Sequence, residues 1–299
     1  MTMAGIASDG ESLAVRTRRL LAELGRRPRR ERGQNFLIDP TLAERVAGLA
    51  CGDEAPQVLE IGAGLGALTE CLAVRAARVV ALELEAAFVE ALHDVLAGSP
   101  HVRIVAGDAL KVDLAGLVDG PPDAWRVAAN LPYYAASAIL VRLLEARPPF
   151  ERLVVMVQKE VGDRLTARPG DEQYGSLSVF AAYQTEDLAV ALRVPRGAFY
   201  PQPKVDSVVL SLRPRRAPRA GVLDEGLLLA VIRAGFGQRR KQLANTLVGL
   251  GSLDRTSAAA ALAEAGIPPP ARAEELDLEA FIALSNALSR SGVRASAAS

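Results

Sequence analysis

The chain has few of the residues that would indicate an extracellular or membrane protein. Its 299 residues include two cysteines, Cys51 and Cys71, a number that suits a reducing compartment and predicts two buried apolar side chains without a bridge. No apolar run approaches the roughly 20 residues that a bilayer requires. Asp9 and Glu11 interrupt the amino terminus before any signal-peptide core. We therefore expect a cytoplasmic protein that does not bind membranes, with an arginine-rich transit peptide as the alternative left open.

Histidine is also scarce, and one charge sign does not dominate. His93 and His101 form no metal-ligand cluster with cysteines or acids, so we expect no metal. The formal net charge is zero, which excludes a uniformly basic protein but not local basic patches. Between residues 16 and 32, eight arginines stand against two glutamates, and further basic clusters occur at 213–219 and 239–241. Such patches bind phosphates, although a solvated helix face or linker is the simpler interpretation of 213–219.

Strand-like and helical patterns alternate through most of the chain. Asp39 and Pro40 form an N-cap and first helical residue, which predicts a helix as far as Leu49. The alternation predicts an α/β fold with a parallel sheet covered by helices on both faces. Two later runs, 187–194 and 206–212, lack a long helix between them and predict an antiparallel hairpin at the edge of the sheet. The parallel strands are expected near 57–61, 78–83, 102–107, 126–131 and 153–157.

Helical periodicity replaces the strand pattern after residue 219. Helices are expected near 224–248, 255–265 and 277–288, which together predict a small helical domain. Leucines at helix-like spacing also occur near the amino terminus, but no core is evident for them to join. The predicted domains are a flexible basic arm at 1–30, the sheet domain at 31–213, a Pro- and Arg-rich linker at 214–219, the helical domain at 220–290 and a disordered tail at 291–299.

A glycine-rich turn joins the first expected strand to a helix. Gly62, Gly64 and Gly66 lack the Cβ atoms that would obstruct a close ligand. Glu83 ends the next strand, where a carboxylate can bind a ribose diol, and Asp108 follows the third. Because the carboxyl ends of parallel strands meet at one crevice, these groups predict a nucleotide site. A dinucleotide-dependent dehydrogenase remains an alternative at this point.

The run Asn130-Leu131-Pro132-Tyr133 ends the fourth strand at the same crevice. An amide oxygen and a backbone carbonyl can accept hydrogen bonds from an exocyclic amine, and a tyrosine can stack on the ring that carries it. The simpler interpretation is a strand-ending turn, since asparagine and proline both favour turns. With an acid at each strand end before it, the run predicts an S-adenosylmethionine-dependent methyltransferase acting on an amino nitrogen.

These motifs and others in the same order resemble the KsgA-type small-subunit adenine dimethyltransferases of the ribosomal RNA adenine N-methylase family. The resemblance covers most of the chain, with departures at Arg32, Ala63 and Gly237. It implies S-adenosylmethionine as cofactor and a Rossmann-like methyltransferase sheet with a small C-terminal helical domain. The landmarks are Gly33-Gln34-Asn35-Phe36-Leu37, the glycine turn, Asn130-Leu131-Pro132-Tyr133, Gln158-Lys159-Glu160-Val161, Tyr174-Gly175-Ser176-Leu177-Ser178-Val179, Ala198-Phe199-Tyr200-Pro201-Gln202-Pro203-Lys204-Val205-Asp206-Ser207 and Phe236-Gly237-Gln238-Arg239-Arg240-Lys241.

The resemblance also assigns roles to residues. Tyr133 and Phe199 would enclose the target adenine, and Asn130 to Tyr133 would form the catalytic run. Arg239, Arg240 and Lys241 would contact RNA. The donor would be bound by Asn35, Leu37, Gly62, Gly64, Glu83, Asp108 and Asn130.

The implied substrate is small-subunit rRNA within the assembling small ribosomal subunit. The resemblance implies dimethylation at N6 of two adjacent adenines in a hairpin loop near its 3′ end, by a monomer. Three alternatives remain: a large-subunit rRNA methylase of the antibiotic-resistance type, an assembly checkpoint factor for which methylation is secondary, and the dehydrogenase.

Overall fold

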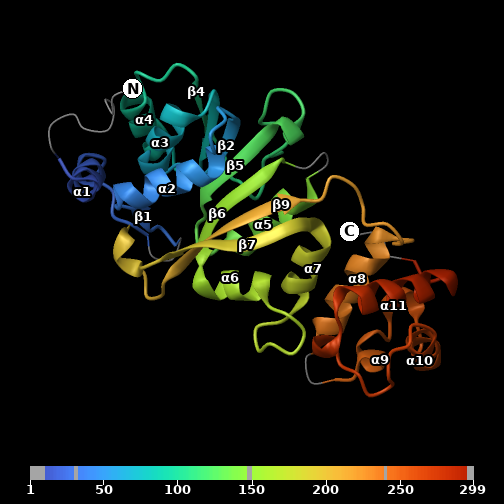
Figure 1. Ribbon diagram of the computed structural model, residues 1–299. Helices are drawn as coiled ribbons and strands as arrows, with labels where there is room; N and C mark the ends of the chain where they lie inside the picture. The colour runs from blue at the N-terminus through green and yellow to red at the C-terminus, as the bar shows by residue number, and fades with distance from the viewer. Residues whose placement is uncertain (1–10, 30–32, 147–149, 239–240, 295–299) are drawn as a thin grey trace. The chain divides into compact units, whose positions relative to one another are not determined.

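The protein is described here by a computed structural model that covers residues 11–29, 33–146, 150–238 and 241–294 (Figure 1). Its contacts divide the chain into two compact units. The first comprises Met1–Gly162 and Asp187–Pro214, and the second Asp163–Glu186 and Arg215–Ser299. Contacts thus group 163–186 with the carboxyl-terminal helices, whereas the sequence-based boundaries place it in the sheet domain. Those boundaries stay a prediction.

A sheet of seven strands, counted over the described residues, has the order β4-β3-β2-β5-β6-β9-β7. The first five are parallel, and β9 runs antiparallel to β6. The predicted mostly parallel α/β sheet with antiparallel edge strands is confirmed. The strands are β2 (Gln57–Ile61), β3 (Arg78–Glu83), β4 (Val102–Ala106), β5 (Trp125–Asn130), β6 (Arg152–Gln158), β7 (Thr185–Val194) and β9 (Ser207–Pro214).

Helices α2, α3 and α4 gather over one face of this sheet (Figure 1). Asp39 caps α2 by accepting a hydrogen bond from the Leu42 backbone, with Pro40 at the first helical position as predicted. Cys51 and Cys71 are both buried and unbridged, as expected from the sequence. The first-unit helices that follow the arm are α2 (Pro40–Cys51), α3 (Ala67–Arg75), α4 (Ala86–Val95) and α5 (Ala136–Glu145). Helix α6 (Lys159–Thr166) includes the point at which the first unit ends, Gly162.

Helix α1 (Leu13–Glu23) has a core to join, which the sequence did not reveal. Leu21 is 3% exposed and packs with Leu65, Phe88 and Ala91. A short antiparallel pair, β1 (Phe36–Leu37) with β8 (Phe199–Tyr200), lies in the same unit. The described part of the arm therefore contains a helix that packs on Leu65 and on α4, while residues 1–10 lie outside the described part. The flexibility of the arm stays a prediction.

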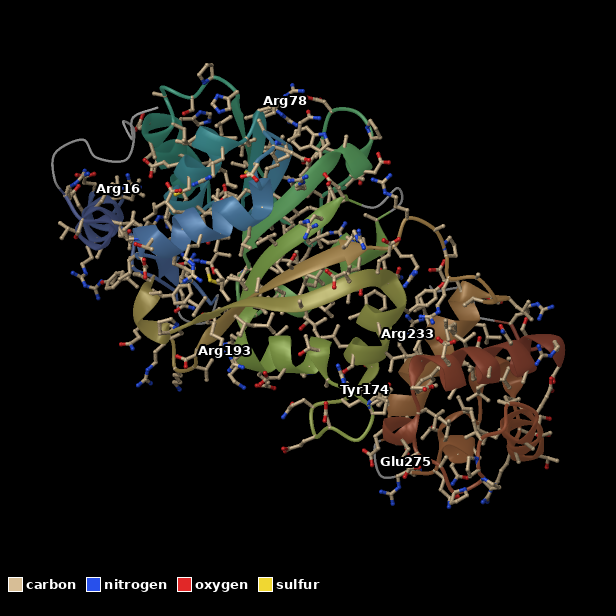
Figure 2. All side chains as sticks on the ribbon, viewed as in Figure 1. Arg16, Arg78, Tyr174, Arg193, Arg233 and Glu275 are labelled. Atoms are coloured by element: carbon tan, nitrogen blue, oxygen red, sulfur yellow. The ribbon has the colours of Figure 1, made fainter. Side chains whose placement is uncertain are left out.

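The second unit is helical, with a core that includes Tyr174 and Phe281. The Tyr174 hydroxyl donates to the Leu276 carbonyl over 2.7 Å (Figure 2). The single helix predicted at 224–248 is wrong, because α8 ends before Gly237, a residue that weakens helix propagation. The helices are α7 (Ser176–Gln184), α8 (Glu225–Phe236), α9 (Leu243–Thr246), α10 (Arg255–Glu264) and α11 (Leu278–Arg290).

Among the described residues, no helix combines the length and the apolar character needed to cross a bilayer.

Candidate active site

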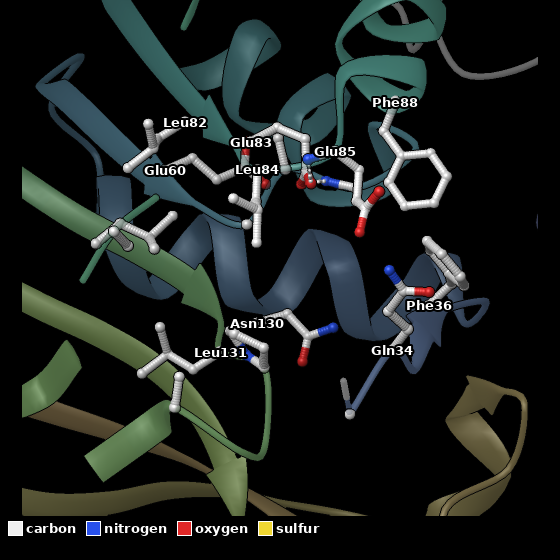
Figure 3. A pocket seen from close by; sticks show the side chains of 18 of the residues that line it. Gln34, Phe36, Glu60, Leu82, Glu83, Leu84, Glu85, Phe88, Asn130 and Leu131 are labelled. Atoms are coloured by element: carbon white, nitrogen blue, oxygen red, sulfur yellow. Dashed lines mark hydrogen bonds between the residues drawn. The ribbon is translucent and has the colours of Figure 1, made fainter. Parts of the chain in front are cut away.

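One pocket in the first unit opens where the carboxyl ends of β2, β3, β4 and β5 meet (Figure 3). This is the edge at which parallel sheets bind their ligands. The structure thus brings together groups that lie far apart in the sequence. Residues predicted from the sequence that line the pocket are Asn35, Leu37, Gly62, Gly64, Glu83, Asp108, Asn130, Leu131, Pro132 and Tyr133.

The glycine turn and Glu83 hold each other in place. The Glu83 carboxylate accepts hydrogen bonds from the backbone N–H of Gly64 at 2.8 Å and of Glu85 at 2.9 Å (Figure 3). Gly64 has φ +59, a left-handed conformation that a residue with a Cβ rarely adopts. Burial raises the pKa of Glu83, while these backbone donors act in the opposite direction. The carboxylate is therefore fixed in orientation and keeps acceptor sites for a ligand.

Asp108 lies at the end of the neighbouring strand. One of its oxygens accepts a hydrogen bond from the Leu110 backbone at 2.9 Å, which fixes the carboxylate beside the pocket. Leu84, which follows Glu83 in the sequence, is 43% exposed and lines the same pocket. A pocket that offers a carboxylate and an exposed apolar side chain suits a flat ring that carries an amine.

The orientation of the Asn130 amide follows from its partner. Its Nδ2 donates to the Asn35 backbone carbonyl over 3.1 Å, a contact that only the nitrogen of the amide can make. Oδ1 is therefore the atom left for the pocket, where Figure 3 shows the side chain. Leu131, whose side chain is 1% exposed, anchors the turn that follows. The site thus presents a fixed acceptor for an amino group.

The two predicted stacking residues differ in placement. Tyr133 lines the pocket, and its hydroxyl lies 2.8 Å from Ser207 Oγ. Phe199 does not line it and is 2% exposed. The antiparallel register pairs Phe199 with Leu37, and both residues belong to one buried hydrophobic cluster of the first unit. Phe199 is thus buried in this structure, and its predicted stacking on the target base stays a prediction.

The predicted RNA-contacting residues lie in the second unit or outside the described part. Lys241 is exposed and lies in a bend rather than on a helix. Arg239 and Arg240 fall outside the described residues, so their predicted role is untested.

Glu60 lines the pocket, although the predicted site does not include it. It lies within β2, is 1% exposed, and its Oε2 has no hydrogen-bond partner among the described residues. Burial raises its pKa to about 8, with the Thr69 hydroxyl opposing and the Glu83 carboxylate adding to the shift. A glutamate within a buried strand next to a glycine turn is the sequence signal that could have assigned it to the pocket.

The raised pKa of Glu60 predicts a pH dependence of stability. Between about pH 4.5 and about pH 8, the Glu60 carboxyl keeps its proton in the folded protein but loses it in the unfolded chain. Wild-type stability should therefore fall with rising pH relative to Glu60→Gln, by an amount that grows up to pH 8. Urea unfolding at pH 5, 6.5 and 8 measures this difference. Glu90→Gln, at an exposed position of α4, is the control, and parallel curves for wild type and Glu60→Gln would contradict the prediction.

Comparison with known proteins identifies the family. The sequence pattern of the family described as ribosomal RNA adenine dimethylase matches residues 25–290. The chain belongs to this family. A protein of Moorella thermoacetica, "Ribosomal RNA small subunit methyltransferase A", is 46% identical over 96% of this chain and 99% of its own length. A protein of the same name from Geobacter metallireducens is 45% identical over 88% and 96%.

Solved structures agree with the fold. A dimethyladenosine transferase from Plasmodium falciparum superimposes with a TM-score of 0.73 at 23% identity, over 86% of this chain and 98% of that one. The 23S rRNA methyltransferase ErmE gives 0.62 at 28% identity, over 85% and 100%. The likeness to the first structure shows the fold, and the family membership shows an S-adenosylmethionine-dependent rRNA adenine dimethyltransferase.

The pocket fits S-adenosylmethionine as the cofactor of this dimethylase. The donor carries a ribose diol, a flat adenine and positive charge. Glu83 offers unused acceptor sites for the diol, Gly64 leaves room beside them, and Asp108 lines the same pocket as an acceptor for the adenine amine. The residues present thus fit the diol and the adenine of the donor in chemical type.

Proposed function

We propose that this dimethylase uses the pocket to methylate N6 of two adjacent adenines in a hairpin loop near the 3′ end of small-subunit rRNA. The observation that carries the proposal is the fixed Asn130 amide, whose oxygen is left to accept a hydrogen bond from an amine. Its relatives are named for the small subunit, and the adenine specificity agrees with the family description.

The difficulty of the reaction is that the lone pair of an adenine amine is delocalised into the ring. Asn130 Oδ1 and the adjacent Leu131 carbonyl supply two acceptors for N6–H, and two directed hydrogen bonds favour a pyramidal, nucleophilic nitrogen. The turn that holds them is rigid, since Pro132 restricts it and Leu131 is buried. Positioning of this kind can supply several kcal/mol of a barrier.

The bound cofactor supplies a methyl carbon activated by a sulfonium. With the donor held by Glu83 and Asp108, N6 would receive the methyl group and would then lose a proton to water. Tyr133 lines the pocket and would stack on the target base, which offsets the few kcal/mol needed to unstack it from RNA.

The substrate in the cell is, in this proposal, the assembling small subunit, bound by a monomer. Phosphate contacts would come from basic side chains, Arg239, Arg240 and Lys241 among them, and binding should weaken as salt rises. A role as an assembly checkpoint is separable from catalysis by comparing a deletion strain with a strain that carries an inactive point variant.

The deciding experiment is methyl transfer from radiolabelled S-adenosylmethionine. Small subunits from a strain lacking the modification are the substrate, with naked large-subunit RNA in parallel. Label on small-subunit adenines, two methyls on each of two neighbours, is the expected result. Label confined to large-subunit RNA would instead place the chain with the ErmE-like methylases. Label on neither, with donor binding intact, would favour the assembly role.

A further inference from the structure

The hydroxyl of Tyr133 has a partner that none of the assigned roles uses. Ser207 is 1% exposed, and its Oγ lies 2.8 Å from the Tyr133 hydroxyl. Ser207 is the first residue of β9 and pairs with Gln158 of β6, so the central sheet fixes its position. A buried hydroxyl that is fixed by a sheet holds the tip of a tyrosine more firmly than water or a loop residue can.

The other end of Tyr133 is held as well. The Gly33 backbone runs so close that a Cβ on Gly33 would lie 2.8 Å from the Tyr133 nitrogen. Tyr133 is therefore fixed at its backbone by Gly33 and at its hydroxyl by Ser207. An aromatic ring that is held at both ends keeps its plane when the pocket is empty.

We propose that Ser207 is a positioning residue for the methyl transfer, which sets the plane of the Tyr133 ring against which the target base stacks. The inference rests on the proposed function of Tyr133. Ser207 ends the landmark that begins at Ala198, and Tyr133 ends the run Asn130-Leu131-Pro132-Tyr133. One hydrogen bond between their hydroxyl groups joins these two motifs.

A double-mutant cycle tests the proposal. Ser207→Ala and Tyr133→Phe should each lower kcat about fivefold to tenfold, the effect of one hydrogen bond, with donor Kd unchanged. The double variant should be no slower than either single variant, because both remove the same bond. The substrate is the unmodified small subunit, and wild-type turnover first establishes the proposed function independently.

Ser211→Ala is the matched control. Ser211 lies on the same strand, and its Oγ accepts a hydrogen bond from Arg152 over 3.1 Å. The variant loses this hydrogen bond, and neither Ser211 nor Arg152 lines the pocket. It should keep the wild-type kcat. An unchanged kcat in Ser207→Ala, or a double variant whose loss is the product of the two single losses, would overturn the positioning role.

A separate observation concerns helix α1. It precedes the segment matched by the family pattern, which begins at residue 25, yet Thr17 is 2% exposed and lines the donor pocket. Leu21 packs on Leu65 of the glycine turn. Arg16 forms a two-point ion pair with Glu70 in the first turn of α3, with one N–O distance of 2.9 Å (Figure 2).

The charges of α1 are largely engaged within the protein. Arg16 pairs with Glu70, and Arg19 pairs with Glu11 and Glu23. The Arg18 guanidinium lies 5.0 Å from the centre of the Tyr200 ring. Arg16 and Arg19 thus have carboxylate partners within the protein, while Arg18 keeps its charge. Helix α1 therefore offers fewer unpaired charges to RNA phosphates than its composition suggests.

We infer that α1 is a wall of the donor pocket and slows release of S-adenosylmethionine. It contacts the glycine turn through Leu65 and the following helix through Glu70, the two elements that form the pocket floor beside Thr17. Like the first proposal, this inference rests on the assignment of the pocket to the donor.

The test is the dissociation rate of radiolabelled S-adenosylmethionine from the full-length protein without RNA. Arg16→Gln should accelerate dissociation about fivefold, as expected for losing a partly buried, two-point ion pair. The exchange Arg16→Glu with Glu70→Arg should restore the wild-type rate. Arg19→Gln removes the same charge from the same helix. Arg19 pairs with Glu11 and Glu23 rather than with α3, so this variant should leave the dissociation rate unchanged.

Two results would overturn the inference. One is an unchanged dissociation rate in Arg16→Gln together with a raised KM for the ribosomal substrate, which would return α1 to RNA binding. The other is equal acceleration by Arg16→Gln and Arg19→Gln, which would show a general effect of charge. Wild-type donor binding and turnover, measured first, keep these results separate from failure of the proposed function.

Discussion

Replacing Asn130 by alanine should lower the rate of methyl transfer by on the order of 10³-fold while leaving donor binding measurable. The substitution removes the amide oxygen that is left to accept a hydrogen bond from N6, so the Leu131 carbonyl is the one proposed acceptor that remains. Single-turnover transfer to unmodified small subunits measures the rate, and calorimetric titration with S-adenosylmethionine measures donor binding. Turnover within tenfold of wild type would exclude Asn130 from the chemistry.

Asn130→Asp refines this test. The aspartate keeps an oxygen toward the pocket but places its second oxygen against the Asn35 carbonyl, where Nδ2 now donates over 3.1 Å. Two acceptors facing each other repel, so the carboxylate should rotate away, and we expect a loss close to that of Asn130→Ala. Full activity in Asn130→Asp with loss in Asn130→Ala would show that the oxygen acts without being held by Asn35.

The parts of the fold that could be predicted are those with local sequence signals. The five parallel strands have apolar runs bounded by turns, and the carboxyl ends of such strands must meet at one edge. Glu83, Asp108 and Asn130 could therefore be placed in one pocket without coordinates, and the structure does bring them together. The capped start of α2 was predictable for the same reason, because Asp39 and Pro40 act within one turn.

What the sequence could not provide are the long-range partners. Leucine spacing shows that α1 has an apolar face, but not that Leu21 packs on Leu65, 44 positions further along the chain. The order of residues around Phe199 does not tell which way its ring turns, since that depends on pairing with Leu37. Contacts of this kind depend on which segments the fold brings together, and a single sequence carries no direct signal for them.

Gly33 lies in a landmark whose physical purpose only the structure shows. It has φ +57, and a Cβ added there would lie 2.8 Å from the Tyr133 nitrogen and 3.1 Å from its Cβ. The first of these atoms is backbone, so relief requires a shift of the turn that carries Asn130 and Tyr133. Because misplacement by about 1 Å can cost on the order of 10²-fold in rate, Gly33→Ala should lower kcat by about that factor.

Gly120→Ala separates this contact from backbone strain alone. Gly120 has φ +83 with nothing within 4 Å of an added Cβ, so its substitution carries the conformational cost, roughly 1 kcal/mol, without the clash. We expect Gly120→Ala to lose a little stability and keep the wild-type kcat, whereas Gly33→Ala loses kcat as well as stability. If the two variants turned over equally, the Gly33 backbone would not be what holds Tyr133, and the ring would depend on Ser207 alone.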